Sequence, residues 1–374
     1  MECIYLDNNA TTALDKRVIN SAKRLLEIYA NPSSDNRQSL QIHNMINVTR
    51  STIAKTINAD FSEIFFTSGG TESIATAFFS ALSEYSKVMI YSAVEHKAVL
   101  HNINRYKLLG YKAICINVDK QGNLNNQELV KCINNNPKSF ISIMHANNET
   151  GVIFPIKQII SLAREKDCLI HVDAIQTFGK LKLNLKELDC DYLSLSLHKF
   201  HCLKGVGVLY VKNKSPLKPI FRGSQEFGKR GGTENTIGII SANDFLQEVN
   251  DRLEQNLIKI QFLRDKFEKE ISDFYPEAMI NGINTNRLYN TTSIILPGIK
   301  SELLKEILDS RNIIVSTGAA CKNSGVHSHV LQAMHLEEDL IDSTLRVSFS
   351  KYNNLKDVEK TVLVIKKYIN KMRG

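Results

Sequence analysis

The sequence lacks the features of several large protein classes. None of its apolar runs reaches the ~18 residues that a membrane-spanning helix requires. The first residues show no basic stretch followed by an apolar one, so we expect no secretory signal peptide. Internal repeats and low-complexity tracts are also missing. These absences predict a globular protein of the cytoplasm with no membrane partner.

Paired cysteines are missing as well. The seven cysteines are an odd number, lie scattered along the chain and include no C-x-x-C pair. This pattern argues against a disulfide framework and against a zinc ribbon, and it favours a reducing compartment. We therefore expect no structural metal.

Clusters of basic residues are likewise absent, although the chain is basic. Lysine and arginine total 47 against 39 acidic residues, which gives a net charge of +8. The lysines are spread over the whole chain and are not grouped with aromatic residues, so we expect no direct binding of nucleic acid. An acidic protein partner fits this charge equally well.

What is present is an alternation of strand-like and helix-like segments. The chain of 374 residues is long enough for one large domain and a smaller one. The predicted strands are 63–68, 87–94, 139–146, 168–174, 192–197 and 205–211, and helical stretches such as 156–166 separate them. This order predicts an α/β fold with a mostly parallel sheet under helices.

The pattern changes near residue 250. Residues 252–274 have apolar side chains at three-to-four spacing, which predicts a long amphipathic connecting helix. Beyond it, 291–298 and 344–350 resemble strands, and helices are predicted over 301–312 and 355–372. A domain change is therefore expected at about this point.

Polar residues follow several of the predicted strands, where ligands bind in parallel α/β sheets. "TSGGTE" (67–72) joins a strand to a helix start, and its free N–H groups suit a phosphate. "HVDAIQ" places Asp173 at a strand end, either as a helix cap or as the partner of a cation. Glycine-rich turns of this kind are common, so neither motif decides the function alone.

"SLSLHKF" (194–200) ends a strand with His198 and Lys199. A solvated turn is one interpretation of this stretch. The other is that a partly desolvated Lys199 loses its proton and forms a Schiff base. Ser196 and His198 would then supply hydroxyl and imidazole groups to a phosphate.

In combination, the ordered motifs resemble the cysteine desulfurases of the NifS/IscS type, which are pyridoxal-phosphate enzymes of the class V aminotransferase group. The motifs are "TSGGTES", "EHKAV", "SIMHANNETG", "HVDAIQTFGK", "SLSLHKFH", "KGVGVLYV", "RGGTEN" and "STGAAC". The resemblance extends from "YLDNNATT" at residue 5 to residue 350.

The resemblance implies a fold-type I pyridoxal-phosphate transferase. Its large cofactor-binding domain would cover residues 15–250 and hold a mostly parallel seven-stranded sheet flanked by helices. A smaller α+β domain would combine residues 1–14 with 251–374 and carry a catalytic cysteine loop at about 316–331. The resemblance also implies a homodimer.

It further implies roles for individual residues. Lys199 would bind pyridoxal 5′-phosphate covalently, Asp173 would pair with the pyridine nitrogen, and His96 would stack on the ring and move protons. The other cofactor residues would be Gly70, Thr71, Ser196 and His198 at the phosphate, Gln176 and Asn148 near the phenolate oxygen, and Thr233 at the phosphate of the neighbouring subunit. The substrate residues would be Arg346, a bidentate partner of the carboxylate, and Asn31.

Cys321 carries the chemistry that the resemblance implies. It lies in a polar segment rich in small residues, unlike the helix- or strand-like surroundings of most other cysteines. Its thiolate would attack the sulfur of L-cysteine held by the cofactor. L-Alanine and a persulfide on Cys321 would result, and the sulfur would pass to an acceptor protein, such as a scaffold for iron–sulfur clusters.

Several positions depart from the family pattern. Ile74, Asn36 and Cys202 stand where relatives usually have other residues, and we interpret Cys202 as a packing residue. Two alternatives therefore stay open. The first is a related pyridoxal-phosphate enzyme, such as an aminotransferase or a selenocysteine lyase. The second is a weakly active relative that acts as a binding partner.

Overall fold

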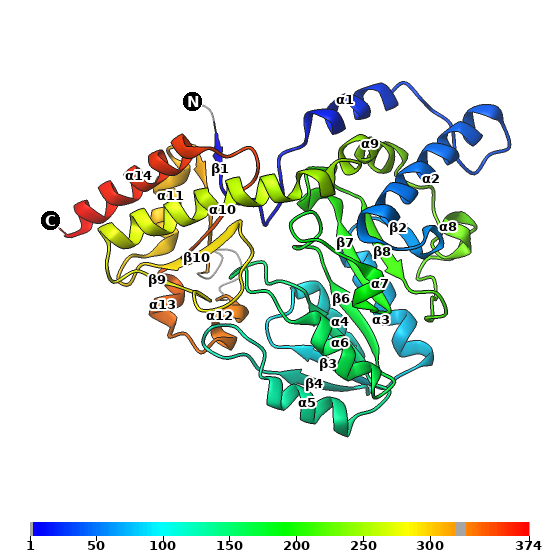
Figure 1. Cartoon of the computed structure of the whole chain (residues 1–374), viewed down its shortest axis with the longest axis horizontal. Coiled ribbons are helices and arrows are strands. Elements are labelled where there is room, and N and C mark those ends of the chain that lie inside the picture. Colours follow the sequence, from blue (N-terminus) through cyan, green and yellow to red (C-terminus); the bar gives the residue numbers. More distant parts are fainter. Residues whose placement is uncertain (1–2, 319–326, 374) are drawn as a thin grey trace.

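A seven-stranded sheet forms the centre of the larger part of the molecule (Figure 1), whose computed structural model describes residues 3–318 and 327–373. The strand order is β2 (Ile64–Thr67), β8 (Gly207–Val211), β7 (Tyr192–Ser196), β6 (Leu169–Asp173), β5 (Phe140–Met144), β3 (Val88–Ser92) and β4 (Lys112–Ile116). β8 runs antiparallel to both of its neighbours, β2 and β7, and the other pairs of this sheet are parallel. The prediction of a mostly parallel sheet is therefore confirmed.

One strand of this sheet is absent from the sequence-based prediction. β4 pairs with β3 at the edge of the sheet, and its residues are mostly half-buried or exposed. The other six strands lie within the stretches expected from the sequence. Residues 113–116 are nevertheless a continuous apolar run, so a signal for this strand is present in the sequence and the prediction overlooks it.

The sheet is buried on both faces. Every residue of β5 is buried, and its first two side chains join different cores. Ile141 belongs to the same core as Ile160, whereas Phe140 packs with Phe78 in the core on the other face. Such burial explains why these strands consist of near-continuous apolar residues. The helices of this part are α1 (Lys16–Leu25), α2 (Arg37–Ile57), α3 (Gly70–Glu84), α4 (Lys97–Leu108), α5 (Asn126–Asn135), α6 (Ile156–Arg164), α7 (Leu185–Leu188), α8 (Gln225–Gly228) and α9 (Thr236–Leu246).

A second, antiparallel sheet forms the smaller part, with the order β12 (Ser316–Thr317), β13 (Thr344–Ser348), β10 (Thr291–Ile295) and β9 (Met279–Ile280). The N-terminal strand β1 (Ile4–Tyr5) pairs in parallel with β11 (Ile313–Ile314), so the chain start lies with its C-terminal region. The helices here are α11 (Ser301–Asp309), α12 (His329–Ala333), α13 (Glu338–Asp342) and α14 (Leu355–Arg373).

The long helix α10 (Val249–Phe274) connects the two parts and lies beside α14 (Figure 1). Its first residue, Val249, belongs to the core of the larger part, whereas Phe267 belongs to that of the smaller part. Most of the residues in these two cores fit our proposal that residues 15–250 form one domain and residues 1–14 with 251–374 form the other. Val330, Leu331, Met334 and Ile341 are exceptions, because they belong to the core of the larger part. Among the described residues, no helix is both long and apolar enough to cross a membrane.

Candidate active site

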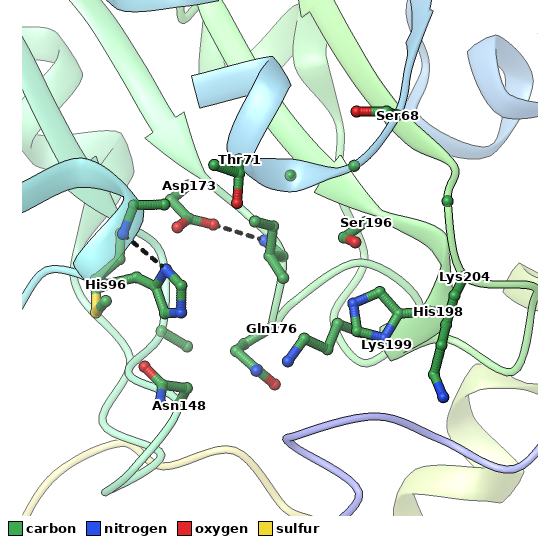
Figure 2. A pocket seen from close by; sticks show the side chains of 17 residues that line it. Ser68, Thr71, His96, Asn148, Asp173, Gln176, Ser196, His198, Lys199 and Lys204 are labelled. Carbon is green, nitrogen blue, oxygen red and sulfur yellow. Dashed lines mark hydrogen bonds between the residues drawn. The ribbon is translucent and has the colours of Figure 1, made fainter. Parts of the chain in front are cut away.

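A cavity of about 370 Å³ opens at the carboxyl ends of the parallel strands (Figure 2). β6 ends at Asp173, β7 ends at Ser196, and α3 begins at Gly70 directly after β2. The structure brings nine sequence-predicted residues together in the wall of this cavity: Gly70, Thr71, His96, Asn148, Asp173, Gln176, Ser196, His198 and Lys199. Elements far apart in the chain therefore converge on one site, as expected for a parallel sheet.

Lys199 lies in a short 3₁₀ turn, Leu197–Lys199, that follows β7. Its ammonium group donates to the backbone carbonyl oxygens of Asn9 and Ala10, both over 2.7 Å. No carboxylate within the described residues forms an ion pair with it. Burial, with a further contribution from Arg346, lowers the pKa of Lys199 to about 8. The amine is therefore partly unprotonated near neutral pH, as a carbonyl-attacking lysine must be.

Asp173 is a buried acid that lacks a full cationic partner. Its Oδ1 accepts a hydrogen bond from the backbone N–H of Ile175 over 3.0 Å, and its side chain lines the cavity. Burial raises the pKa of Asp173 to about 6. A cationic group in the cavity would offset this desolvation, and a protonated ring nitrogen is one such group.

His96 is the N-cap of α4. Its Nδ1 accepts a hydrogen bond from the backbone N–H of Ala98 over 3.1 Å, so the proton of the neutral ring lies on Nε2. Burial, together with the nearby Lys199, lowers the pKa of His96 to about 4. His96 is thus an uncharged imidazole at physiological pH, with one defined donor.

The turn before α3 is built for an anion. A Cβ atom on Gly70 would lie 2.3 Å from Cδ1 of Ile175, so a side chain at this position would require Ile175 to move. The first helical N–H bond to a carbonyl is that of Ser73, which leaves the N–H groups of Gly70 and Thr71 available. His198 contacts Thr11 through Nδ1 over 3.1 Å, and its side chain also lines the cavity.

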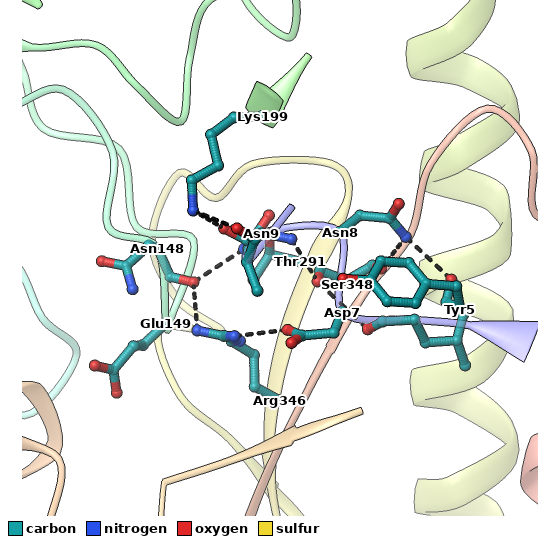
Figure 3. A network of polar contacts seen from close by, with 12 residues as sticks. Tyr5, Asp7, Asn8, Asn9, Asn148, Glu149, Lys199, Thr291, Arg346 and Ser348 are labelled. Carbon is teal, nitrogen blue, oxygen red and sulfur yellow. Dashed lines mark hydrogen bonds and ion pairs between the residues drawn. The ribbon is translucent and has the colours of Figure 1, made fainter. Parts of the chain in front are cut away.

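Arg346 adjoins the cavity in a polar network (Figure 3). One of its terminal nitrogens pairs with Asp7 over 2.7 Å, and the other donates to the carbonyl oxygen of Asn148 over 3.4 Å. Its Nε is buried and has no partner among the described residues. A buried donor without a partner is costly, so a carboxylate entering here would gain a charge-assisted hydrogen bond.

The structure does not bring the remaining predicted residues into the cavity wall. Asn31 is exposed, and its side chain accepts from the N–H of Ser33. Thr233 is exposed too. Cys321 lies outside the described residues. The roles of these three residues therefore stay predictions.

The residues on either side of segment 319–326 are well anchored. The N–H of Ser328 donates to the carbonyl of Gly318 over 3.1 Å, and its hydroxyl donates to Glu149. His329 contacts the carbonyl oxygen of Glu95 over 2.8 Å. Glu95 and Glu149 directly adjoin His96 and Asn148 in the chain, so α12 is attached to the two loops that carry these cavity residues.

Sequence reasoning misses the residue at the centre of the polar network. Asn9 lies in "LDNNATT" and is almost fully buried. Its carbonyl oxygen accepts from Lys199 and Gln176, and its side-chain amide contacts Asn148, Lys180, Asn290 and Thr291. The signal was available, since two adjacent asparagines follow a strand-like segment, but a lone asparagine pair is typical of a turn.

Comparisons with known proteins agree with this geometry. The family model of the class-V aminotransferases matches residues 4–361. The chain belongs to this family. A cysteine desulfurase IscS of Dictyoglomus turgidum is 37% identical over 376 residues, which cover 99% of this chain and 95% of the relative.

Solved structures give the same result. A NifS-like protein matches with a TM-score of 0.91 and 32% identity over 99% of this chain and 100% of its own. A structure of SspA in complex with cysteine matches with a TM-score of 0.81 and 31% identity over 94% of this chain and 100% of its own. The resemblance to NifS/IscS-like proteins of the class V aminotransferases and the expected α/β fold are confirmed.

Proposed function

We propose that this protein is a cysteine desulfurase that uses pyridoxal 5′-phosphate to convert L-cysteine into L-alanine and transferable sulfur. One observation carries the proposal. A buried amine with a lowered pKa, that of Lys199, shares a cavity with Asp173 and with the open turn at Gly70 and Thr71. The relatives named cysteine desulfurase support the same activity.

The residues present fit the cofactor. The turn at Gly70, with Ser196 and His198, would hold its phosphate, and Lys199 would hold it covalently. The carboxylate of Asp173 would pair with the protonated ring nitrogen. When bound in this way, the ring supplies an electron sink that weakens the carbon–sulfur bond of an attached cysteine. No cluster of metal-binding residues occurs in the described chain.

Arg346 and His96 would act on the substrate. Arg346 presents an unpartnered buried donor beside the cavity, which suits the carboxylate of an amino acid. His96 is neutral and has its proton on Nε2, so this atom would donate a hydrogen bond to a substrate group. To take up a proton, its Nδ1 would have to release the N–H of Ala98. Amide groups of Asn148 and Gln176 line the same cavity and would bind the ring edge.

The sulfur step needs a thiol from the protein, and we assign it to Cys321. Its thiolate attacks the substrate sulfur, the bond between that sulfur and Cβ breaks, and Cβ takes up a proton to become the methyl group of alanine. The products are a persulfide on Cys321 and L-alanine, so atoms and electrons balance without an added oxidant. An acceptor protein, such as an iron–sulfur scaffold, would then remove the sulfur.

We extend the proposal to the assembly and its surroundings. Thr233 and Asn31 are exposed on a single chain, and a homodimer would place such residues at a neighbouring subunit. Of the described cysteines, Cys132, Cys168, Cys190 and Cys202 are free and buried, which supports a reducing, cytoplasmic location. The burial of Cys202 also supports its interpretation as a packing residue.

The experiment is a product balance. The purified protein is loaded with pyridoxal 5′-phosphate and incubated with L-cysteine and a reducing thiol. A desulfurase forms alanine and sulfide in equal amounts, and Lys199→Ala forms neither. An aminotransferase would instead form a keto acid and no sulfide. A protein that binds the cofactor but yields no alanine would be the weakly active binding partner.

A further inference from the structure

Lys180 is a buried lysine behind the cavity for which the mechanism above has no role. Only 8% of its surface is exposed. Its ammonium group donates to Oε1 of Gln176 over 2.9 Å and to Oδ1 of Asn9 over 3.2 Å. Within the described residues no carboxylate forms an ion pair with it. A buried lysine that contacts amide oxygens alone is rare, because desolvation of the ammonium group is expensive.

The charges around Lys180 make its position still more costly. Lys199 and Arg346 are the charged groups that act on it, and both are cations. Burial and these two cations lower the pKa of Lys180 to about 7. An anion bound in the cavity would therefore favour its charged form.

The local backbone places Lys180 against Gln176. The segment after β6 forms successive turns, in which Lys180 follows Gln176 by four residues. Gly179 has φ +68°, and a Cβ there would lie 1.9 Å from the ring of Phe200. Only glycine fits this position, so the turn that delivers Lys180 is fixed by packing.

The contacts determine which way the Gln176 amide points. The carbonyl oxygen of Asn9 can only accept, and it lies 3.0 Å from one end of the amide, which must be Nε2. The other end is Oε1, and Lys180 donates to it. The second N–H of Nε2 has no partner in the described chain, and Gln176 lines the cavity. Gln176 is thus held as a hydrogen-bond donor.

We propose that Lys180 is a positioning residue for the cofactor, which holds and polarises the Gln176 amide so that it donates to the anionic ring oxygen of bound pyridoxal phosphate. The inference rests on the function proposed above and deepens it. The ammonium group withdraws electrons through Oε1, which strengthens the N–H donor at the other end of the same amide. The ammonium group also places a positive charge near the ring oxygen, with only the Gln176 amide between them.

This role predicts a spectroscopic signature. A strong donor and a nearby cation would stabilise the anionic ring oxygen, and so would lower the pH at which the visible absorbance of the cofactor held by Lys199 changes. Lys180→Met should raise the midpoint of this visible absorbance change by about one pH unit. The measurement is a pH titration of the holoprotein absorbance, together with the affinity of the cofactor-free protein for pyridoxal phosphate.

Matched variants separate this role from a structural one. Lys182→Met removes an exposed lysine two residues away and should titrate like the wild type. Lys180→Gln keeps a donor for Oε1 without the charge and should shift the midpoint in the same direction as Lys180→Met. In a Gln176→Ala background, Lys180→Met should add a smaller shift, because Lys180 acts through that amide.

The outcomes are distinct. Midpoints of Lys180→Met and Lys180→Gln equal to that of the wild type would overturn the role of Lys180, while the wild type could still form alanine and sulfide. If Lys180→Met does not fold, the titration of Lys180→Gln decides the question alone. A wild-type protein that produces no alanine would instead contradict the proposed function.

Discussion

The ammonium group of Lys199 donates to the carbonyl oxygen of Asn9 over 2.7 Å, although 190 positions separate the two residues in the chain. Asn9 follows the N-terminal strand, whereas Lys199 follows β7 of the large sheet (Figure 3). The contact therefore joins the region that carries Arg346 to the region that carries the phosphate turn. The candidate active site exists only where these two parts of the chain meet.

The first prediction concerns the protonation of Lys199. An unprotonated amine attacks the cofactor aldehyde, and burial lowers the pKa of this lysine from 10.5 to about 8. The rate at which cofactor-free protein gains its visible colour should therefore rise with pH and level off above about pH 9. Stopped-flow absorbance measures this rate. A rate that keeps rising to pH 10.5 would show a lysine with an ordinary pKa.

The second prediction concerns His96. Its replacement by alanine removes a neutral proton carrier but leaves Lys199 in place, so turnover should fall by roughly a hundredfold or more. The visible absorbance of the holoprotein should remain. His101→Ala changes an exposed residue of the same helix and serves as the control. Equal turnover in both variants would exclude His96 from the chemistry.

The third prediction concerns Arg346. Lysine keeps the charge but cannot bind a carboxylate through two parallel hydrogen bonds. Arg346→Lys should therefore raise KM for L-cysteine by roughly tenfold or more and change kcat less. Steady-state kinetics separate the two constants, with the exposed Arg311→Lys as the control. An unchanged KM would show that the substrate carboxylate binds elsewhere.

The fourth prediction concerns a buried ion pair that supports the site from behind. Arg50 and Glu226 form two hydrogen bonds of 2.7 and 2.8 Å, and the side chains are only 3% and 1% exposed. Glu226 also accepts from the N–H of Phe66 over 2.7 Å. Arg50→Met leaves this carboxylate buried and unpaired, which should cost about 3 kcal/mol of unfolding free energy.

Urea unfolding of Arg50→Met measures this cost. The matched control is Lys269→Met, which breaks an exposed pair with Asp273 on α10 and should cost less than about 0.5 kcal/mol. Similar losses of unfolding free energy in the two variants would mean that the buried ion pair stabilises the fold no more than the exposed pair does. The pair also fixes the segment from which Arg230 reaches Glu72 in the first turn of α3.

Much of the site could be predicted from the sequence, because its residues lie at or near the ends of strands. Asp173 and Ser196 end buried strands, Gly70 and Lys199 lie shortly after such strands, and parallel strands bring their carboxyl ends to one edge. The order of the motifs then identifies the family. Two strands of the smaller sheet, β10 and β13, also lie within stretches predicted from the sequence, 291–298 and 344–350.

The rest depends on tertiary contacts that leave little local signal. Asn9 and Lys180 lie within motifs of the family resemblance, but their roles come from burial among groups that converge from distant segments. The edge strand β4 is a different case, because its apolar run at 113–116 is present in the sequence. The roles predicted for Asn31 and Thr233 cannot be judged from one chain, because both side chains are exposed on it.

The most direct test of the account is the sulfur balance of Cys321→Ser. We propose that this thiol captures the sulfur and that other residues bind the cofactor. The variant should therefore keep the colour of the bound cofactor and form neither a persulfide nor sulfide from L-cysteine, while the wild type forms one sulfide per alanine. Sulfide release from Cys321→Ser at the wild-type rate would contradict the account.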